Sequence, residues 1–224
     1  MRFVLILGLS GLTSLGPARA FQAEHPLTGR RIAPMMSADG APWLDRSERE
    51  AEENPNGALD AIGIKRGMTV ADVGAGTGYM TLRLAARVGP TGTVYASDIQ
   101  EEMLRRLRQN AAKANFSNIK TVLGASVDSR LPKSQMDLIL LVDVYHEFSQ
   151  PQKMIESLRE ALKPSGRLVL LEYRKEDPSI PIRPEHKMSI HEVKTELEAE
   201  GFRLDQIIET LPRQHILVLK QRVK

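Results

Sequence analysis

A buried strand that runs into a glycine-rich turn and then a helix constrains the fold of this 224-residue chain more than any other feature. Residues 70–79 read VADVGAGTGY, with Gly74, Gly76 and Gly78 at alternate positions. Glycines allow a tight turn and let a ligand approach the backbone closely, while the helix start supplies free N–H groups. A dinucleotide-binding loop would carry its third glycine at Tyr79, so the spacing departs from that fingerprint. The segment predicts a ligand-binding loop in an α/β protein.

Strand and helix patterns alternate from residue 68 to the C-terminus. The pattern predicts strands over residues 68–73, 92–97, 119–123, 136–142, 167–172, 203–211 and 215–220, of which 68–73 and 136–142 are mainly apolar. Apolar side chains at helical spacing predict helices over residues 77–87, 101–114 and 151–162, and a capping box at Ser189 begins a further helix that Gly201 closes. This alternation, followed by a terminal hairpin, predicts a single α/β domain with a mostly parallel sheet.

The N-terminal 20 residues have the layout of a secretory signal peptide. Arg2 is followed by an apolar run of about 14 residues and by small residues up to Ala20, where we expect cleavage. Because a membrane-spanning helix needs about 20 apolar residues, we expect export to the periplasm or beyond without a stable membrane span. A membrane-anchored or a cytoplasmic protein is the alternative. Residues 21–57 are predicted to form an arm with a lid helix, which a capping box at Ser47 begins, and residues 58–224 the main domain. The arm around Trp43, Asp45 and Arg46 either folds over a bound ligand as a lid or packs on the edge of the domain.

Composition excludes several classes of function. The chain has no cysteine, which rules out disulfides, thiolate metal sites and cysteine nucleophiles. The formal charge is +3 and falls to +1 without Arg2 and Arg19, so the sequence predicts no nucleic-acid partner. One Trp, four Tyr and five Phe provide no stacking platform for single strands.

Four segments resemble the motifs of class I S-adenosylmethionine (SAM)-dependent methyltransferases, in the order of that family. They are VADVGAGTGYMT, YASDIQ, MDLILLVDVYHEF and LKPSGRLVLLEY. The resemblance extends over residues 58–220. Within the family, the chain is similar to the small-molecule methyltransferases of quinone biosynthesis and their bacterial relatives. It implies a Rossmann-like sheet of seven strands in the order 3-2-1-4-5-7-6, mostly parallel, with helices on both faces and a C-terminal antiparallel hairpin.

The resemblance also implies which residues bind SAM. The family's ribose-binding acid corresponds to Asp98, which ends the second strand 20 residues after Gly78. Many family members carry an acid in the loop after the third strand, but here the run is Gly-Ala-Ser. Either Ser126 or Asp128 replaces that acid, or the contact is lost. The expected cofactor-binding residues are Asp72, Gly74, Ala75, Gly76, Gly78, Asp98, Ile99, Met103, Ser126 and Asp143.

Methyl transfer from a sulfonium needs a general base only when the acceptor is a hydroxyl or an acidic carbon. The candidates His146, Tyr145 and Glu147 follow the fourth strand, and His146 has the most suitable intrinsic pKa, although a hydrogen-bonded structural histidine is the alternative. Residues 172–174 and 213–215 are further candidates for the acceptor pocket. Because His186 and His191 are five residues apart, beyond the one-turn spacing of a helical metal pair, the sequence predicts no metal site.

The resemblance and the exclusions favour a small-molecule or lipid-like acceptor. SAM is made in the cytosol, so an exported methyltransferase poses a conflict. An exported, non-catalytic module that binds SAM or a nucleotide is therefore the alternative, followed by a nucleotide-dependent oxidoreductase. The sequence makes no prediction of the oligomeric state.

Overall fold

The computed structural model describes residues 23–222, and the predicted signal peptide lies outside them. Seven strands form one sheet in the order β3-β2-β1-β4-β5-β7-β6, which confirms the predicted topology. Their bounds are β1 Thr69–Val73, β2 Thr93–Asp98, β3 Ile119–Leu123, β4 Met136–Val142, β5 Leu162–Tyr173, β6 Phe202–Ile208 and β7 Gln214–Gln221. The pairs from β3 to β5 are parallel, whereas β7 runs antiparallel to both β5 and β6. Because the dinucleotide dehydrogenases use a 3-2-1-4-5-6 sheet, this order excludes that oxidoreductase fold.

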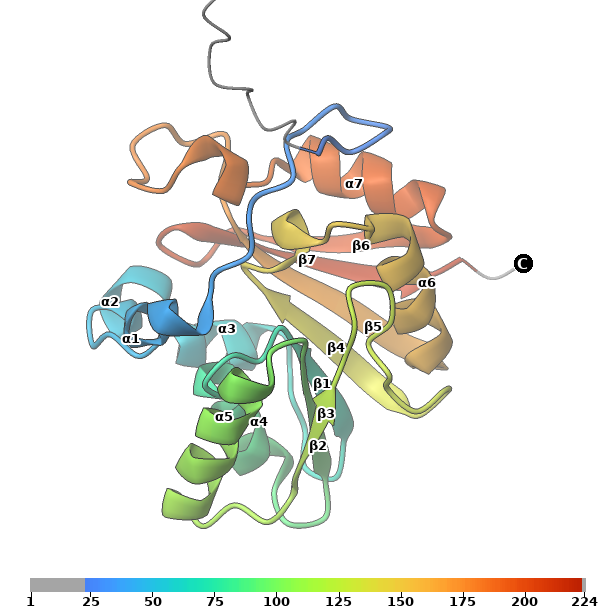
Figure 1. Cartoon of the computed structure of the whole chain (residues 1–224). Coiled ribbons are helices and arrows are strands. Elements are labelled where there is room, and N and C mark those ends of the chain that lie inside the picture. Colours follow the sequence, from blue (N-terminus) through green and yellow to red (C-terminus); the bar gives the residue numbers. More distant parts are fainter. Residues whose placement is uncertain (1–22, 223–224) are drawn as a thin grey trace, which may run out of the picture.

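Helices cover both faces of the sheet, as predicted (Figure 1). Successive side chains of a strand point to opposite faces, so Ile139 and Leu141 of β4 belong to one apolar cluster and Leu138 and Leu140 to the other. Helices α6 (Pro151–Ala161) and α7 (Ile190–Ala199) supply the first cluster. Helices α3 (Pro55–Ala61) and α4 (Tyr79–Val88) supply the second, and α5 (Glu101–Lys113) packs beside them on β2 and β3.

The N-terminal arm crosses from α7 to the glycine loop (Figure 1, blue). Near α7 the buried Arg30 guanidinium donates to both oxygens of the Glu196 carboxylate. The arm then forms η1 (Ala38–Gly40), α1 (Ala41–Leu44) and α2 (Arg49–Glu53). At that end the Thr77 hydroxyl donates to Asp45 at 2.6 Å. The arm is thus fixed at both ends and passes over the carboxyl edge of the sheet.

The structure corrects the expected start of the lid helix. The Ser47 hydroxyl bonds the neighbouring Glu48 carboxylate rather than a backbone N–H, so no capping box forms, and α2 begins at Arg49. The capping box at Ser189, by contrast, is complete, because Ser189 and Glu192 each bond the other's backbone. Within residues 23–222, no helix is long and apolar enough to cross a bilayer.

Candidate functional site

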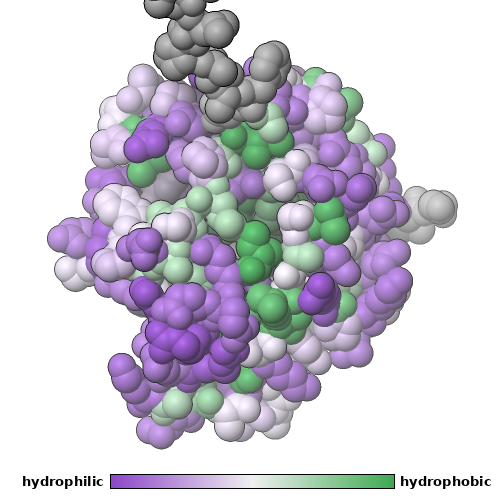
Figure 2. Space-filling view, viewed as in Figure 1, coloured by the Kyte–Doolittle hydropathy of each residue, from purple (hydrophilic) through white to green (hydrophobic). Residues whose placement is uncertain are grey.

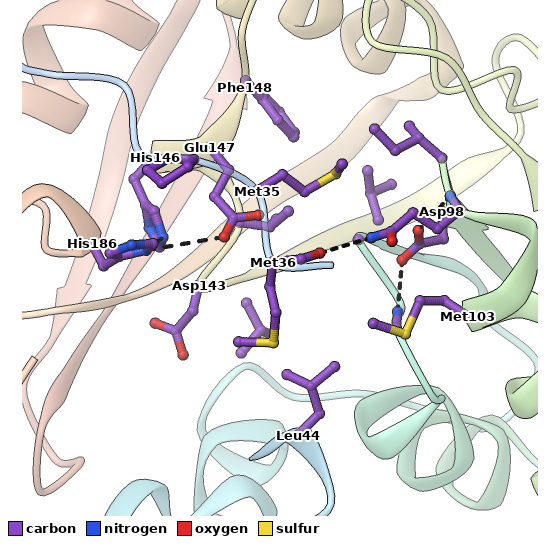
Figure 3. A pocket seen from close by; sticks show the side chains of 18 of the residues that line it. Met35, Met36, Leu44, Asp98, Met103, Asp143, His146, Glu147, Phe148 and His186 are labelled. Carbon is purple, nitrogen blue, oxygen red and sulfur yellow. Dashed lines mark hydrogen bonds and ion pairs between the residues drawn. The ribbon is translucent and has the colours of Figure 1, made fainter. Parts of the chain in front are cut away.

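A cavity of about 630 Å³ lies at the carboxyl edge of the sheet. The loops after β1, β2, β3 and β4 form one wall, and the arm and the segment around η3 (Pro184–His186) form the other. Figure 2 shows apolar side chains gathered around a hollow in the middle of this face. Figure 3 shows Asp98 and Met103 at one end of the cavity and His146, Glu147 and His186 at the other. The predicted ligand-binding edge is therefore a real pocket.

The glycine loop brings the backbone of β1 to the cavity. Gly74, Gly76 and Gly78 all have positive φ, which L-residues rarely adopt. A Cβ on Gly74 would lie 2.4 Å from Val144, and one on Gly76 would lie 2.9 Å from Leu44 of the arm. Gly74 and Gly76 line the cavity as expected; a side chain on Gly74 would press on the loop after β4, and one on Gly76 would press on the arm in the opposite wall.

The other two expected loop residues do not line the cavity. Gly78 caps the start of α4, and a Cβ there would lie 2.8 Å from Leu107 of α5. Ala75 is buried against Leu107 and Ala96. Both positions therefore serve the packing of the loop on α5, which sets the position of the neighbouring Gly74 and Gly76.

Asp98 lies at the end of β2, where the sequence predicted a ribose-binding acid. Its Oδ2 accepts from the Gly76 N–H and its Oδ1 from the Gln100 N–H, both at 2.9 Å. Burial raises the pKa of Asp98, and these backbone donors lower it. Because each carboxylate oxygen has further lone pairs, Asp98 can still accept two hydroxyl groups from the cavity side.

The expected adenine-binding residues also meet at this end. Ile99 and Met103 line the cavity next to Asp98, and Ser126 lines it from the loop after β3. Asp128, the other candidate for the missing acid, instead accepts from the Arg130 N–H and from the Ser157 hydroxyl. Ser126 is therefore the residue of that loop that is placed to replace the acid.

The structure does not place Asp72 at the cavity. The side chain of Asp72 is buried beside α4 and accepts from the Thr81 hydroxyl at 2.6 Å. Burial raises its pKa to about 6. Asp72 therefore supports the loop from behind, because a β1 side chain at this position points toward α4 rather than toward the strand end.

Asp143 does reach the cavity, from the residue after β4. Its Oδ2 accepts from Gln214 Nε2 at 2.6 Å, whereas its buried Oδ1 has no partner. Burial raises the pKa of Asp143 well above its ordinary value, and the nearby Glu53 and Glu172 carboxylates raise it further. Its backbone is left-handed, with φ 51°, which holds the carboxyl in place at some cost. Asp143 is thus a buried acceptor ready for a cationic donor.

The sequence places Arg46 in the candidate lid, but sequence patterns did not reveal Arg49 and Glu53, the other charged groups that the arm contributes. Arg46, Arg49 and Glu53 all line the cavity. Arg49 Nε donates to Glu53 at 2.6 Å, and Arg46 donates to Glu53 at 3.0 Å. Because arm and sheet are far apart in sequence, no local motif marks these residues. Arg49 lies close enough to Asp143 to lower its pKa, so its guanidinium can supply donors for a carboxylate near that residue.

His146 and Glu147 lie in η2 (Tyr145–Glu147), at the end of the cavity away from Asp98 (Figure 3), and both line the cavity. His146 Nδ1 lies 2.7 Å from a carboxylate oxygen of the fully buried Glu172, and its Nε2 lies 3.2 Å from Nδ1 of His186. Burial raises the pKa of Glu147 to about 7 and lowers the pKa of His186.

Three residues expected near the acceptor lie elsewhere. The ring of Tyr145 is buried, and its hydroxyl donates to Glu196 at 2.7 Å, behind the cavity wall. Arg174 pairs with Glu209, and His215 is buried against the Met188 carbonyl. The prediction that Tyr145 lies in the pocket is therefore wrong. The tight turn of η2 sends adjacent side chains in different directions.

The cavity fits SAM on four observations. Asp98 is placed to accept the two ribose hydroxyls, and a Cβ on Gly76 would fill the space beside the arm. The unpartnered Oδ1 of Asp143 is placed to accept from the methionine ammonium group, and Arg49 lies nearby for its carboxylate. A nucleoside that carries an amino acid thus meets a polar partner at each end.

Comparisons with known proteins agree with this reading. Residues 64–214 match the family model described as a methyltransferase domain. The chain is 32% identical over 118 residues to the "Ubiquinone/menaquinone biosynthesis C-methyltransferase UbiE" of Citrobacter koseri, which covers 52% of the chain and 47% of that relative. The chain thus spans about half the length of the curated relatives it matches. The fold also resembles a putative type 11 methyltransferase from Sulfolobus solfataricus, with a TM-score of 0.63 and 22% identity over 77% of the chain and 95% of that protein.

A solved structure gives a fuller match. The crystal structure of a SAM dependent methyltransferase from Aquifex aeolicus is 31% identical, covers 84% of this chain and 100% of that one, and superposes with a TM-score of 0.78. Together with the family match over residues 64–214, this shows that the chain belongs to the methyltransferase domain family and carries a class I SAM-dependent methyltransferase domain.

Proposed function

We propose that the protein transfers a methyl group from SAM to a small, largely apolar acceptor such as a phenol or a quinol. One observation carries this proposal: a single cavity joins the nucleoside end at Asp98 to the acid–base cluster at His146. A cofactor held by Asp98 and Asp143 leaves the His146 end for a second molecule. The domain thus has room for an acceptor beside the cofactor.

The lining of the cavity indicates the kind of acceptor. Apolar side chains surround the space between the two ends, among them Met36, Phe148, Met154 and Ile182. Flexible methionines accommodate flat or irregular apolar molecules. The curated relatives are named for ubiquinone and menaquinone biosynthesis, which supports an aromatic acceptor.

SAM, when bound, supplies an electrophilic methyl carbon, so the work of this chain is placement and exclusion of water. The arm covers the cofactor end, with Leu44 against Gly76. At the acceptor end the hydrogen bond from His146 Nδ1 to Glu172 leaves Nε2 as the acceptor nitrogen of that ring, 3.2 Å from Nδ1 of His186. An acceptor O–H or acidic C–H placed there therefore meets a proton-accepting group.

Calorimetric titration with SAM tests the cofactor half of the proposal. We expect the native protein to bind SAM at micromolar concentration, and Asp98→Ala to weaken binding by about 10- to 100-fold, because hydrogen bonds to a charged group are lost. Asp60→Ala is the matched control, since Asp60 is an exposed aspartate on α3 that pairs with Arg87. It should bind as the native protein does.

Incubation with SAM and a panel of phenols, naphthols and quinols tests the acceptor half. Mass spectrometry should find a methylated product together with S-adenosylhomocysteine. Binding of SAM without transfer to any acceptor class would favour a non-catalytic binding module. Absence of SAM binding would refute the proposal altogether.

We propose in addition that residues 1–20 direct export of the protein, on the basis of the signal-peptide pattern alone. Residues 1–26 fused to a reporter that is active only outside the cytoplasm should give signal, and residues 21–26 fused to the same reporter should not. A silent fusion of residues 1–26 would contradict export.

A further inference from the structure

The acceptor end of the cavity holds two histidines and a glutamate that the proposed cofactor does not use. His146 and Glu147 come from η2, and His186 ends η3, 40 residues later in the chain. Within residues 23–222, no other three side chains of the metal-binding types bring their ligand atoms so close together. All three side chains line the cavity and point toward one another (Figure 3).

The distances within this cluster suit a single ion. His146 Nε2 and His186 Nδ1 lie 3.2 Å apart, and metal–nitrogen bonds of about 2.0–2.1 Å at a tetrahedral angle place two ligand atoms about 3.3 Å apart. A Glu147 carboxylate oxygen lies 4.0 Å from His186 Nδ1, and the three ligand atoms are all within 4.8 Å of one another. A rotation of the Glu147 carboxylate would bring it into the same coordination sphere.

A buried carboxylate orients the first of these ligands. Glu172 lies 2.7 Å from His146 Nδ1, so that nitrogen carries the proton and the Nε2 lone pair faces His186. Metal-binding histidines almost always donate their second N–H to a carboxylate or carbonyl, which fixes the tautomer and makes the ligand more basic. Glu172 is placed for this role.

The charge of the cluster favours a cation. Across the described part of the chain, Glu147 and Glu172 form ion pairs with histidines alone, and with no lysine or arginine. Buried carboxylates are normally paired with a cation or a metal. Two carboxylates and two imidazoles therefore leave a negative site that a divalent ion would neutralise.

We propose that His146 Nε2, His186 Nδ1 and the Glu147 carboxylate bind one divalent transition-metal ion of the zinc type, with its open coordination positions facing the acceptor cavity. Two imidazoles and one carboxylate suit zinc and its first-row neighbours, and a catalytic site of this kind leaves a position for substrate. In terms of the proposed function, on which this step rests, the ion would hold an acceptor oxygen and ease loss of its proton.

The proposed site differs from the pair His186 and His191, whose spacing predicted no metal site. His186 and His191 were judged by their spacing along the chain, but His191 lies exposed on α7 and outside the cluster. The partner of His186 in the cluster is His146, which lies in η2 after β4. His191 thus provides a matched control, as a histidine outside the cavity.

Tag-free protein, stripped of metal by a chelator, should be titrated with Zn²⁺ by calorimetry and with Co²⁺ by visible absorption. We expect one equivalent per chain, with the d–d bands of a low-symmetry Co²⁺ site. His186→Ala and Glu147→Gln should each weaken binding at least tenfold, and Glu172→Gln by roughly 10- to 100-fold through the orientation of His146. His191→Ala should bind as the native protein does.

Thermal unfolding of each variant establishes that it is folded, and SAM titration of the same samples keeps the two proposals separate. Loss of metal binding in His186→Ala with SAM affinity intact supports the metal site. No metal binding by the native protein, or equal binding by native and His186→Ala protein, overturns it and leaves the cluster as a hydrogen-bonded pair of histidines. Neither result changes the conclusion about SAM, which would fail only in its own titration.

Discussion

Asp143 and Gln214 form a part-buried hydrogen bond of 2.6 Å, yet each keeps one buried oxygen without a partner. The two residues come from the end of β4 and the start of β7, which are separated in the sheet by β5. Unsatisfied buried acceptors are costly and are expected where a ligand completes the bonding. The pair therefore marks the place where a cationic donor enters the cavity, and the SAM ammonium group is such a donor.

Asp143→Asn should separate stability from cofactor binding. The substitution removes a buried charge near Glu53 and Glu172 and supplies an N–H donor, so we expect the ligand-free protein to gain about 1 kcal/mol. Asparagine also tolerates the left-handed backbone at this position. SAM affinity should fall by about 10- to 100-fold, because a charged hydrogen bond to the ammonium is lost. Denaturant unfolding and calorimetry measure the two effects, and unchanged SAM affinity would contradict the assignment.

Gly76→Ala should impair SAM binding through the arm. Its Cβ would lie 2.9 Å from Leu44, and its φ of 54° is strained for alanine. Gly63→Ala is the matched control, because Gly63 has φ 68° but open space around it. Both variants should lose about 1–2 kcal/mol of stability. Only Gly76→Ala should also raise the Kd for SAM, by roughly fivefold or more.

Addition of Leu44→Ala to Gly76→Ala should restore part of the SAM affinity, because it removes the clashing side chain. If Gly63→Ala weakened SAM binding as much as Gly76→Ala, general destabilisation rather than contact with the arm would be the cause.

Tyr145→Phe tests the removal of Tyr145 from the candidate catalytic residues. Its hydroxyl donates to Glu196, which also binds Arg30 of the arm. Loss of a hydrogen bond to a charged partner should cost about 1.5–3 kcal/mol in the free energy of unfolding. SAM affinity and the rate of methyl transfer should stay at the native level. A stable variant with lost methyl transfer would place Tyr145 back in the catalytic group.

Asp72→Asn should alter how stability depends on pH. The pKa of Asp72 is raised to about 6 by burial, so the folded state keeps the proton that the unfolded chain releases near pH 4. The native protein therefore loses stability from this group as pH rises from about 4 to 7. The variant should lack that loss. Its free energy of unfolding relative to that of the native protein should therefore be about 2–3 kcal/mol higher at pH 8 than at pH 4. Urea unfolding at both pH values measures the difference, and a pH-independent difference would refute the raised pKa.

Much of the fold follows from local pattern. The strands at residues 119–123 and 136–142 have the predicted bounds. For residues 136–142 the reason is an almost continuous apolar run, which marks a strand buried on both faces. Other elements begin or end a few residues away from their predicted bounds. Strand β5 begins at Leu162, directly after α6, because pairing with Met136 of β4 extends it. The pairing partner of a strand end is not visible in its own sequence.

The sequence by itself determined the glycine loop, Asp98 and the order of strands and helices, because each depends on residues within about 20 positions of one another. Only the tertiary structure decided which of the expected residues face the cavity. Asp72 and Tyr145 turn away, whereas Arg49 and His186 turn in. Those outcomes depend on long-range packing of the arm and of η3 against the carboxyl edge of the sheet, where side chains from distant segments meet.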